Sequence, residues 1–292
     1  MVRKSDGVIP GVNDVRLSYR AWEATDPHAA LIVVHGLGEH AGRYAGFGVR
    51  MAEAGISTFA MDLRGHGLSE GRRGHAPSFD VYLQELDRFR REVEGLHHTP
   101  VPLFLLGHSM GGLIALRYQE EYAGRFRAAI IVSPWLATAM PVPRLRAAAA
   151  NLFSRVMPAL PFRSGINPDH LSRDRAIVDA YRADPLVHST ITPRLFTEAS
   201  AAMGLALQRS DRIREPLIFM LAGDDRIVDT ARSVCFARAI TAVHADVRVF
   251  PGEYHELLNE LGRAEIHRLV RDWILEMSTV KRETTNSVKR ET

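Results

Sequence analysis

The sequence has little cysteine, no long apolar run and little net charge. Its 292 residues include one cysteine, Cys235, which excludes an intramolecular disulfide and a multi-cysteine metal site. We expect Cys235 to be a buried apolar residue. Apolar stretches fall short of the roughly 18 to 20 residues that span a bilayer. The formal net charge is +3 and the basic residues are dispersed, which argues against nucleic acid as a partner.

The two ends of the chain carry no apolar segment either. Residues 1–7 hold two basic residues with no apolar stretch behind them, so no secretory signal is visible. Hydrophobic residues make up 46% and charged residues 24%, the balance of a globular protein with a large core. These features predict a soluble, cytoplasmic protein. The polar residues 279–292 repeat Lys-Arg-Glu-Thr, and we expect a mobile tail there.

Short apolar runs alternate with amphipathic stretches along most of the chain, which predicts an α/β fold. Such alternation is typical of a mostly parallel sheet with helices on both faces. The strand at 15–24 alternates like one at a sheet edge, whereas 29–34 reads as a central strand. Further strands are predicted at 57–61, 101–106, 128–132, 217–221 and 247–250, and helices at 42–54, 78–93, 110 to about 122, 230–240 and 262–277.

The alternation stops in the middle of the chain. Residues 134–207 are rich in proline and contain short helix-like apolar groups without a buried strand. We therefore predict a core made of residues 1–133 and 208–278, with 134–207 inserted over one end of the sheet.

One glycine-rich turn suggests a nucleophile. Gly107-His108-Ser109-Met110-Gly111 has the pattern Gly-x-Ser-x-Gly and lies between a predicted strand and a predicted helix. In such a turn the serine projects its hydroxyl from a strained backbone, and side chains at the glycines would clash. We therefore predict that Ser109 is a nucleophile; a purely structural glycine turn is the alternative.

A serine nucleophile needs a base to take its proton, and an acid to orient that base. After a Gly-x-Ser-x-Gly turn, acid and histidine are expected in that order at later strand ends. Asp224 and Asp225 follow the predicted strand 217–221. We favour Asp225, which lies further round the loop where a carboxylate can turn back toward an imidazole. Asp224 is the alternative.

The base is expected after the last strand. His255 follows the predicted strand 247–250, whereas His244 precedes it and His267 lies in the last predicted helix. Only His255 therefore follows a strand end. We predict that Ser109, Asp225 and His255 form a catalytic triad.

These motifs, taken together, resemble one family. The chain is similar to α/β-hydrolases of the monoacylglycerol lipase and lysophospholipase branch, a group also labelled serine aminopeptidase-like. The resemblance covers about residues 12–277. It is carried by His35-Gly36-Leu37-Gly38-Glu39-His40-Ala41-Gly42-Arg43-Tyr44, Asp62-Leu63-Arg64-Gly65-His66-Gly67-Leu68-Ser69, 107–112, Asp184-Pro185-Leu186-Val187, Gly223-Asp224-Asp225-Arg226 and Tyr254-His255-Glu256.

The resemblance implies further site residues. The backbone N–H groups of Leu37 and Met110 would form an oxyanion hole; the family usually has a smaller residue at Leu37, which affects the shape of the pocket. Glu39, Arg43 and His108 would line a polar pocket for a glycerol-like leaving group. A surface or scaffold role is the alternative for these three residues.

No metal or organic cofactor is implied. His35 and His40 have no acidic or cysteine partner that would complete a metal site. The segment Arg64-Gly65-His66-Gly67 lacks the Lys-Ser/Thr ending of a phosphate-binding loop, so we expect a tight turn there.

By the resemblance, residues 134–207 form a cap over the active site. One interpretation is that the apolar groups of the cap are buried on the core. The other is that the cap faces a lipid interface, as arginine-flanked apolar helices do, and admits a single acyl chain. The apolar residues are Leu152, Phe153, Val156, Met157, Leu160 and Phe162, and the arginines are Arg144, Arg146, Arg155 and Arg163.

The predicted activity is hydrolysis of monoacylglycerols or similar single-chain lipid esters, with peripheral membrane contact through the cap. A lysophospholipase, in which Arg155 or Arg163 meets a phosphodiester, and a small-ester carboxylesterase are alternatives. An aminopeptidase is disfavoured, because Asp169, Asp174 and Asp179 do not form an obvious acidic cluster. A ligand-binding protein with the hydrolase fold is the non-enzymatic alternative. The sequence sets no oligomeric state.

Overall fold

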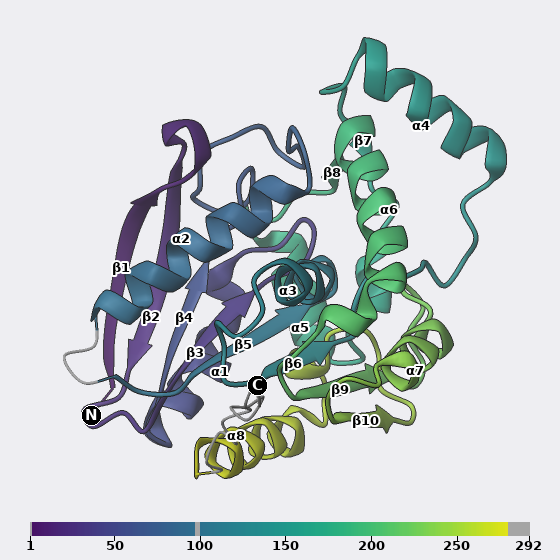
Figure 1. Ribbon diagram of the computed structural model, residues 1–292. Helices are drawn as coiled ribbons and strands as arrows, with labels where there is room; N and C mark the ends of the chain where they lie inside the picture. The colour runs from purple at the N-terminus through teal and green to yellow at the C-terminus, as the bar shows by residue number, and fades with distance from the viewer. Residues whose placement is uncertain (1, 97–99, 280–292) are drawn as a thin grey trace, which may run out of the picture.

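A computed structural model describes residues 2–96 and 100–279 of the chain (Figure 1). The centre of this part is an eight-stranded sheet in the order β1-β2-β4-β3-β5-β6-β9-β10. β2 runs antiparallel to both β1 and β4, and the other neighbours are parallel. The strands are β1 Arg3–Pro10, β2 Arg16–Glu23, β3 Ala29–Val34, β4 Ile56–Met61, β5 Leu103–His108, β6 Ala129–Val132, β9 Leu217–Ala222 and β10 Ala245–Phe250.

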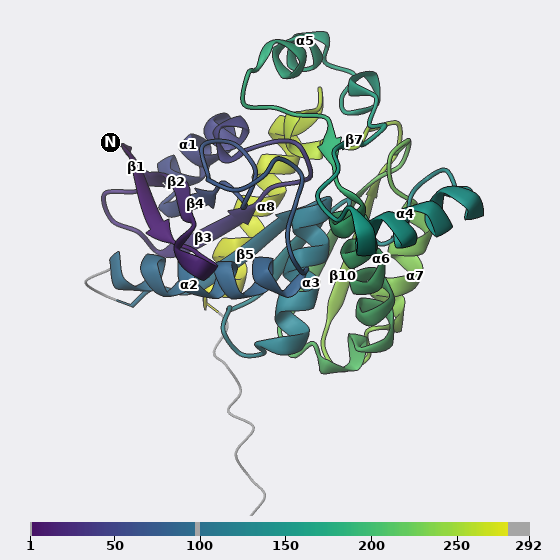
Figure 2. The same cartoon turned by 90° about the horizontal axis from the view of Figure 1, so that it is seen from above.

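Helices cover both faces of the sheet, as the view from above shows (Figure 2). On one face lie α2 (Asp80–Leu96), α3 (Met110–Glu121) and α7 (Thr230–Ala239). The other face is covered by α1 (Ala45–Glu53) and α8 (Arg263–Thr279). The strands β3, β5 and β9 are buried along their whole length, which accounts for their continuous apolar sequences. The predicted α/β class is confirmed.

The edge of the sheet differs from the prediction. β1 pairs with β2 from Arg3 opposite Glu23 to Pro10 opposite Arg16, so β2 is next to the edge and not at it. β1 was not predicted, because nearly all of its side chains are exposed and it therefore lacks an apolar alternation.

Cys235 is exposed, so the prediction of a buried cysteine was wrong. It lies in α7, whose buried side chains are Ser233, Phe236 and Ala237. These residues recur at the three- and four-residue spacing of one helix face, and Cys235 is on the opposite face. The burial of an apolar residue in a helix thus depends on the helix face on which it lies, and not on its residue type alone.

Residues 134–207, which we call the cap segment, lie between β6 and β9. The long helix α6 packs against α3 and buries Leu195, Ala199 and Ala202, while α4 rests on α6 and stands away from the sheet (Figure 1). Ser154 Oγ of α4 is 2.9 Å from Thr197 Oγ1 of α6. The elements are α4 Arg144–Val156, β7 Phe162–Arg163, α5 Arg175–Ala183, β8 Thr190–Ile191 and α6 Pro193–Gln208.

Within residues 2–96 and 100–279, none of the helices combines the length and the apolar character that crossing a bilayer requires. The tail predicted to be mobile lies, apart from Thr279, outside the described residues.

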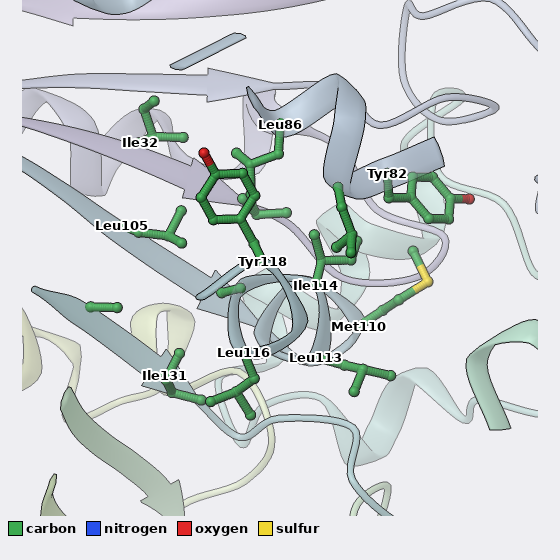
Figure 3. Close-up of a cluster of buried hydrophobic side chains, with 14 of the residues drawn as sticks. Ile32, Tyr82, Leu86, Leu105, Met110, Leu113, Ile114, Leu116, Tyr118 and Ile131 are labelled. Atoms are coloured by element: carbon green, nitrogen blue, oxygen red, sulfur yellow. The ribbon is translucent and has the colours of Figure 1, made fainter. Parts of the chain in front are cut away.

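The first turn of α3 is packed tightly against the sheet. Ile114 and Tyr118 extend from α3 toward α2 (Figure 3). A methyl group at Gly111 would lie 2.1 Å from Val34 O of β3, and one at Gly107 would lie 2.3 Å from Gly111 O. Backbone therefore meets backbone here, with no room for a side chain.

We predict that Gly111→Ala lowers the free energy of unfolding by about 3 kcal/mol or more, because the methyl group displaces α3 from β3. Gly204→Ala is the matched control: a methyl group there meets no atom within 4 Å, and Gly204 lies inside α6. That variant should be more stable than the wild type by about 0.5–1 kcal/mol. Urea unfolding checks both; equal stabilities of the two variants would contradict the close approach.

Candidate active site

Ser109 occupies the sharp turn between β5 and α3. Its backbone angles are φ 55° and ψ −116°, a conformation that residues other than glycine rarely adopt. The turn is held by the N–H of Ser109, which donates to Val132 O at 3.0 Å, and by its carbonyl, which accepts from Leu113 N and Trp135 N. Strain of this kind persists only where the surroundings impose it, and it is common at functional sites.

The acid and the base predicted from the sequence form a pair. Asp225 follows β9, His255 follows β10, and His255 Nδ1 lies 2.7 Å from Asp225 Oδ2. Asp225 Oδ1 accepts from Ile227 N at 2.8 Å and from Val228 N at 2.9 Å. Both side chains are buried. With Nδ1 donating to the carboxylate, His255 Nε2 has the free lone pair of a general base.

The surroundings of Asp225 favour its charged form. Burial by itself would raise the pKa of this carboxyl, but the neighbouring His255 and the two backbone N–H donors hold the pKa below its ordinary value. A carboxylate that stays ionised keeps the imidazole in one tautomer and one orientation.

The alternative acid and bases lie elsewhere. Asp224 is exposed, and its backbone N–H donates to Glu253 O. His244 is exposed and lies 3.0 Å from Asp246. His267 is buried in α8, where its Nε2 is 3.0 Å from Leu258 O. The fold therefore brings Asp225 to His255 and leaves the other candidates apart from it.

The loop after β3 passes beside the serine. A methyl group at Gly36 would lie 3.1 Å from Ser109 Cβ, so this loop and the nucleophile turn are in contact. Gly38, with φ 83°, accepts from His188 N at 2.9 Å. Within the described residues, neither the N–H of Leu37 nor that of Met110 has a hydrogen-bond partner. Two backbone donors beside Ser109 are thus left for a bound group.

The polar residues predicted to line the pocket are joined in a buried cluster. Glu39 Oε1 accepts from Gly36 N at 2.6 Å and from Tyr44 OH at 3.0 Å, and is 3.0 Å from His108 Nδ1. Arg43 reaches both Glu39 and Glu256. Contact of Glu39, Arg43 and His108 with a leaving group stays a prediction.

Charges in this cluster stabilise one another. Burial opposes ionisation of Glu39, but the hydrogen bond with His108 and the nearby Arg43 hold the pKa of its carboxyl well below the usual range. Burial also opposes the charged form of His108 and by itself would lower the pKa of this ring. The hydrogen bond to Glu39 and the charge of that carboxylate raise the pKa above its ordinary value. Sequence reasoning missed Glu256 as a member of the cluster. The one signal for Glu256 in the sequence was its place directly after His255. Its pairing with Arg43 could not be foreseen, because 213 residues separate the two side chains along the chain.

The histidines of the motifs hold loops in place. His35 Nε2 accepts from Leu63 N at 2.9 Å, and burial lowers the pKa of this ring. His40 Nε2 lies 2.8 Å from Asp184 Oδ2, which ties the cap segment to the loop after β3. The predicted turn at 64–67 is present, with positive φ at Gly65 and Gly67.

A cavity of about 500 Å³ lies within the cap segment, between its first residues, α4 and α6. Trp135, whose N–H donates to Ser109 O, belongs to its lining. Most of the lining is apolar and includes Leu136, Val142, Phe196 and Met203. The cavity therefore offers apolar volume in the cap segment, and Trp135 connects its wall to the serine turn.

Comparison with known proteins identifies the family of this chain. A family model described as serine aminopeptidase, S33, matches residues 25–262. The chain belongs to this family. The monoacylglycerol lipase of Mycolicibacterium smegmatis is 31% identical over 274 residues, which are 93% of this chain and 97% of that protein. Phospholipase YtpA of Bacillus subtilis is 29% identical, over 86% of this chain and 96% of that protein.

A solved structure has the same fold. The crystal structure of Paleococcus ferrophilus monoacylglycerol lipase matches with a TM-score of 0.82 at 28% identity, over 95% of this chain and 100% of that chain. The predicted membership in the α/β-hydrolases is confirmed. This S33 family member is a serine hydrolase of the lipase and esterase type.

We predict that Asp225→Asn lowers kcat for p-nitrophenyl butyrate by about four orders of magnitude, because the amide no longer fixes the imidazole tautomer. Asp224→Asn, one position away on the same loop, should keep nearly the wild-type rate. Steady-state kinetics of the two variants compares them directly. A large loss in Asp224→Asn with none in Asp225→Asn would reverse the assignment.

Proposed function

We propose that this S33 hydrolase cleaves monoacylglycerols, or similar single-chain lipid esters, to a fatty acid and glycerol. The observation that carries the proposal is the buried Asp225–His255 pair, joined at 2.7 Å, on loops beside the strained turn of Ser109. The monoacylglycerol lipases among the relatives support the choice of substrate class. A hydrolase-fold protein that only binds a ligand would not need the strained serine or the paired histidine.

The reaction divides into two acyl transfers. Ser109 Oγ attacks the ester carbonyl while His255 Nε2 takes its proton, and collapse of the tetrahedral intermediate expels the glycerol oxygen, which receives that proton. Water then attacks the acyl-enzyme, with His255 again as the base, and the fatty acid leaves as Ser109 regains its proton. Asp225 stays ionised throughout and orients the ring.

The oxyanion of each intermediate needs donors that are already in place. The N–H groups of Leu37 and Met110 are without partners in the described part of the chain and flank the serine turn. The Met110 side chain is fully buried in the core below the turn, which anchors its N–H (Figure 3). One such donor is typically worth about 3 kcal/mol of transition-state stabilisation.

The cavity beside Trp135 supports a lipid acyl group as the bound part of the substrate. Its lining is mainly apolar, so it favours hydrocarbon over a charged group. Trp135, one of the lining residues, ties the cavity wall to the serine turn, because its backbone N–H donates to Ser109 O.

An aminopeptidase activity is less well supported, despite the family's name. A free α-amine needs an available carboxylate, but Asp169 pairs with Arg175 and Arg182. Asp174 pairs with Arg263. A lysophospholipase remains the second candidate, because phospholipase YtpA is a relative and the cap arginines Arg155 and Arg163 are exposed.

The test is turnover of a substrate panel by the wild type and by Ser109→Ala. We expect the wild type to hydrolyse monoacylglycerols faster than lysophospholipids, diacylglycerols and aminoacyl amides, and to be labelled by a fluorophosphonate. Ser109→Ala should lose both properties while its thermal unfolding stays cooperative. Retained turnover in Ser109→Ala refutes the mechanism. If the wild type hydrolyses lysophospholipids faster than monoacylglycerols, the protein is a lysophospholipase and the proposed substrate is wrong.

We also propose that the cap segment contacts lipid surfaces. The interpretation in which its apolar groups are all buried is wrong for α4, because Leu145, Leu152 and Val156 are 83%, 61% and 63% exposed. Their spacing of seven and four residues places them on one face, opposite the face that packs on α6 through Ser154. Met157 is exposed as well, and Arg144, Arg146 and Arg155 flank this stripe. An apolar stripe with basic flanks suits an anionic bilayer surface.

We predict that Leu152→Glu combined with Val156→Glu weakens binding to vesicles of phosphatidylcholine and phosphatidylglycerol by at least about tenfold, since two apolar side chains no longer insert. Leu261→Glu is the control, because Leu261 is equally exposed, at 61%, but lies beside α8 on the core. Co-sedimentation measures all three proteins. Equal vesicle binding by the double variant and the control would refute contact of the cap segment with lipid through α4.

A further inference from the structure

A buried cluster of charges lies beside the groups proposed for catalysis. We call Glu39, Arg43, His108 and Glu256 the Arg43 cluster. Arg43 Nη1 and Nη2 meet the two oxygens of Glu256 at 2.5 and 2.7 Å, a bidentate pair. Arg43 Nη1 also lies 3.3 Å from Glu39 Oε2. Each side chain in the cluster is less than 10% exposed. A single guanidinium therefore joins two carboxylates that water does not reach.

Each carboxylate of the cluster is attached to a different catalytic segment. Glu39 accepts from Gly36 N, one residue before Leu37, and so shapes the oxyanion loop. Glu256 directly follows His255 in the chain.

His108 links the same cluster to the nucleophile. It directly precedes Ser109, and its Nδ1 lies 3.0 Å from Glu39 Oε1. Its Nε2 lies 3.4 Å from His255 O, and the two rings are 4.8 Å apart. The oxyanion loop, the nucleophile turn and the histidine loop thus meet at one set of charges.

The cap segment closes the cluster from outside. Arg43 Cζ lies 4.7 Å from the centre of the Tyr181 ring, which belongs to α5. The ring keeps water from the guanidinium and raises the cost of leaving either carboxylate unpaired. Removing one partner of such a buried pair leaves an uncompensated charge, which the surrounding loops relieve by moving.

We propose that Arg43 is a positioning residue that holds the oxyanion loop, the nucleophile turn and the histidine loop in register through Glu39 and Glu256. The proposal rests on the triad of the proposed function. Arg43 need not touch the substrate; it acts through the two carboxylates. Because small displacements of reacting groups are costly, its loss should appear in the chemical step more than in substrate binding.

The charge of Arg43 also has a predictable effect on proton transfer. Without it, Glu39 and Glu256 present uncompensated negative charge near His255, which favours the imidazolium form. The acidic limb of the kcat/KM profile should then move to higher pH. Asp225 and His108 contact the His255 residue directly. The titratable groups that interact with the Arg43 cluster are Tyr44 and Tyr181.

The experiment compares Arg43→Met and Arg43→Lys with Arg117→Met, which breaks another buried arginine pair, that with Glu120 in α3. We expect Arg43→Met to lower kcat for p-nitrophenyl butyrate about 100-fold with little change in KM. Its acidic limb should rise by about one pH unit. Arg43→Lys keeps the charge but not the bidentate geometry, so it should restore the acidic limb and only part of kcat. Arg117→Met should lose stability and keep both properties.

A folded Arg43→Met with the kcat and acidic limb of the Arg117→Met control overturns the proposal. Should Arg43→Met fail to fold, Glu256→Gln serves in its place, because it keeps the side-chain size and one acceptor. That variant should lower kcat and move the acidic limb to lower pH, the opposite direction; an unchanged profile overturns the proposal. Retained turnover in Ser109→Ala would instead refute the proposed function. If Ser109→Ala loses turnover while Arg43→Met keeps the wild-type kcat and pH profile, only the positioning role of Arg43 is refuted.

Discussion

The close approach of the first turn of α3 to the end of β3 is the constraint on which the rest of the site depends. Gly111 leaves no space between its backbone and Val34 O, and Gly107 is equally crowded by Gly111 O. This contact holds Ser109 in a left-handed conformation that its side chain would not choose, with the hydroxyl at the end of β5. The large apolar core around α3 supplies the stability that offsets this strain (Figure 3). The position of Ser109 is thus set by this backbone packing together with the hydrogen bonds of its own N–H and carbonyl.

Polar interactions then place the other groups relative to that serine, and most of them are buried. Asp225 is held by two backbone N–H donors and in turn holds His255, so the ring has one orientation and one tautomer. Around it the Arg43 cluster balances two carboxylates with one guanidinium. In a desolvated setting such charges are costly unless every one is paired, which makes the arrangement specific as well as stable. The same desolvation strengthens any donor that faces a developing oxyanion.

The cap segment has two faces with different chemistry. Toward the core, Asp184 binds His40, His188 binds the loop after β3, and Tyr181 covers Arg43. Toward solvent, α4 presents an apolar stripe with arginines beside it, above an apolar cavity. The cap segment thus combines contacts that hold the loops of the site with apolar surface and apolar volume, which supports the proposed lipid substrate class.

The sequence by itself determined the α/β class and the strand ends at which Ser109, Asp225 and His255 stand. Those features are local, because continuous apolar runs mark buried strands and a Gly-x-Ser-x-Gly turn needs its glycines wherever it occurs. Tertiary structure alone decided that β1 forms the edge, that Cys235 is exposed and that the stripe of α4 is uncovered. It also decided the pairing of Arg43 with Glu256, across 213 residues. Exposure and charge pairing depend on which segments meet in space, and no local pattern of residue types records that.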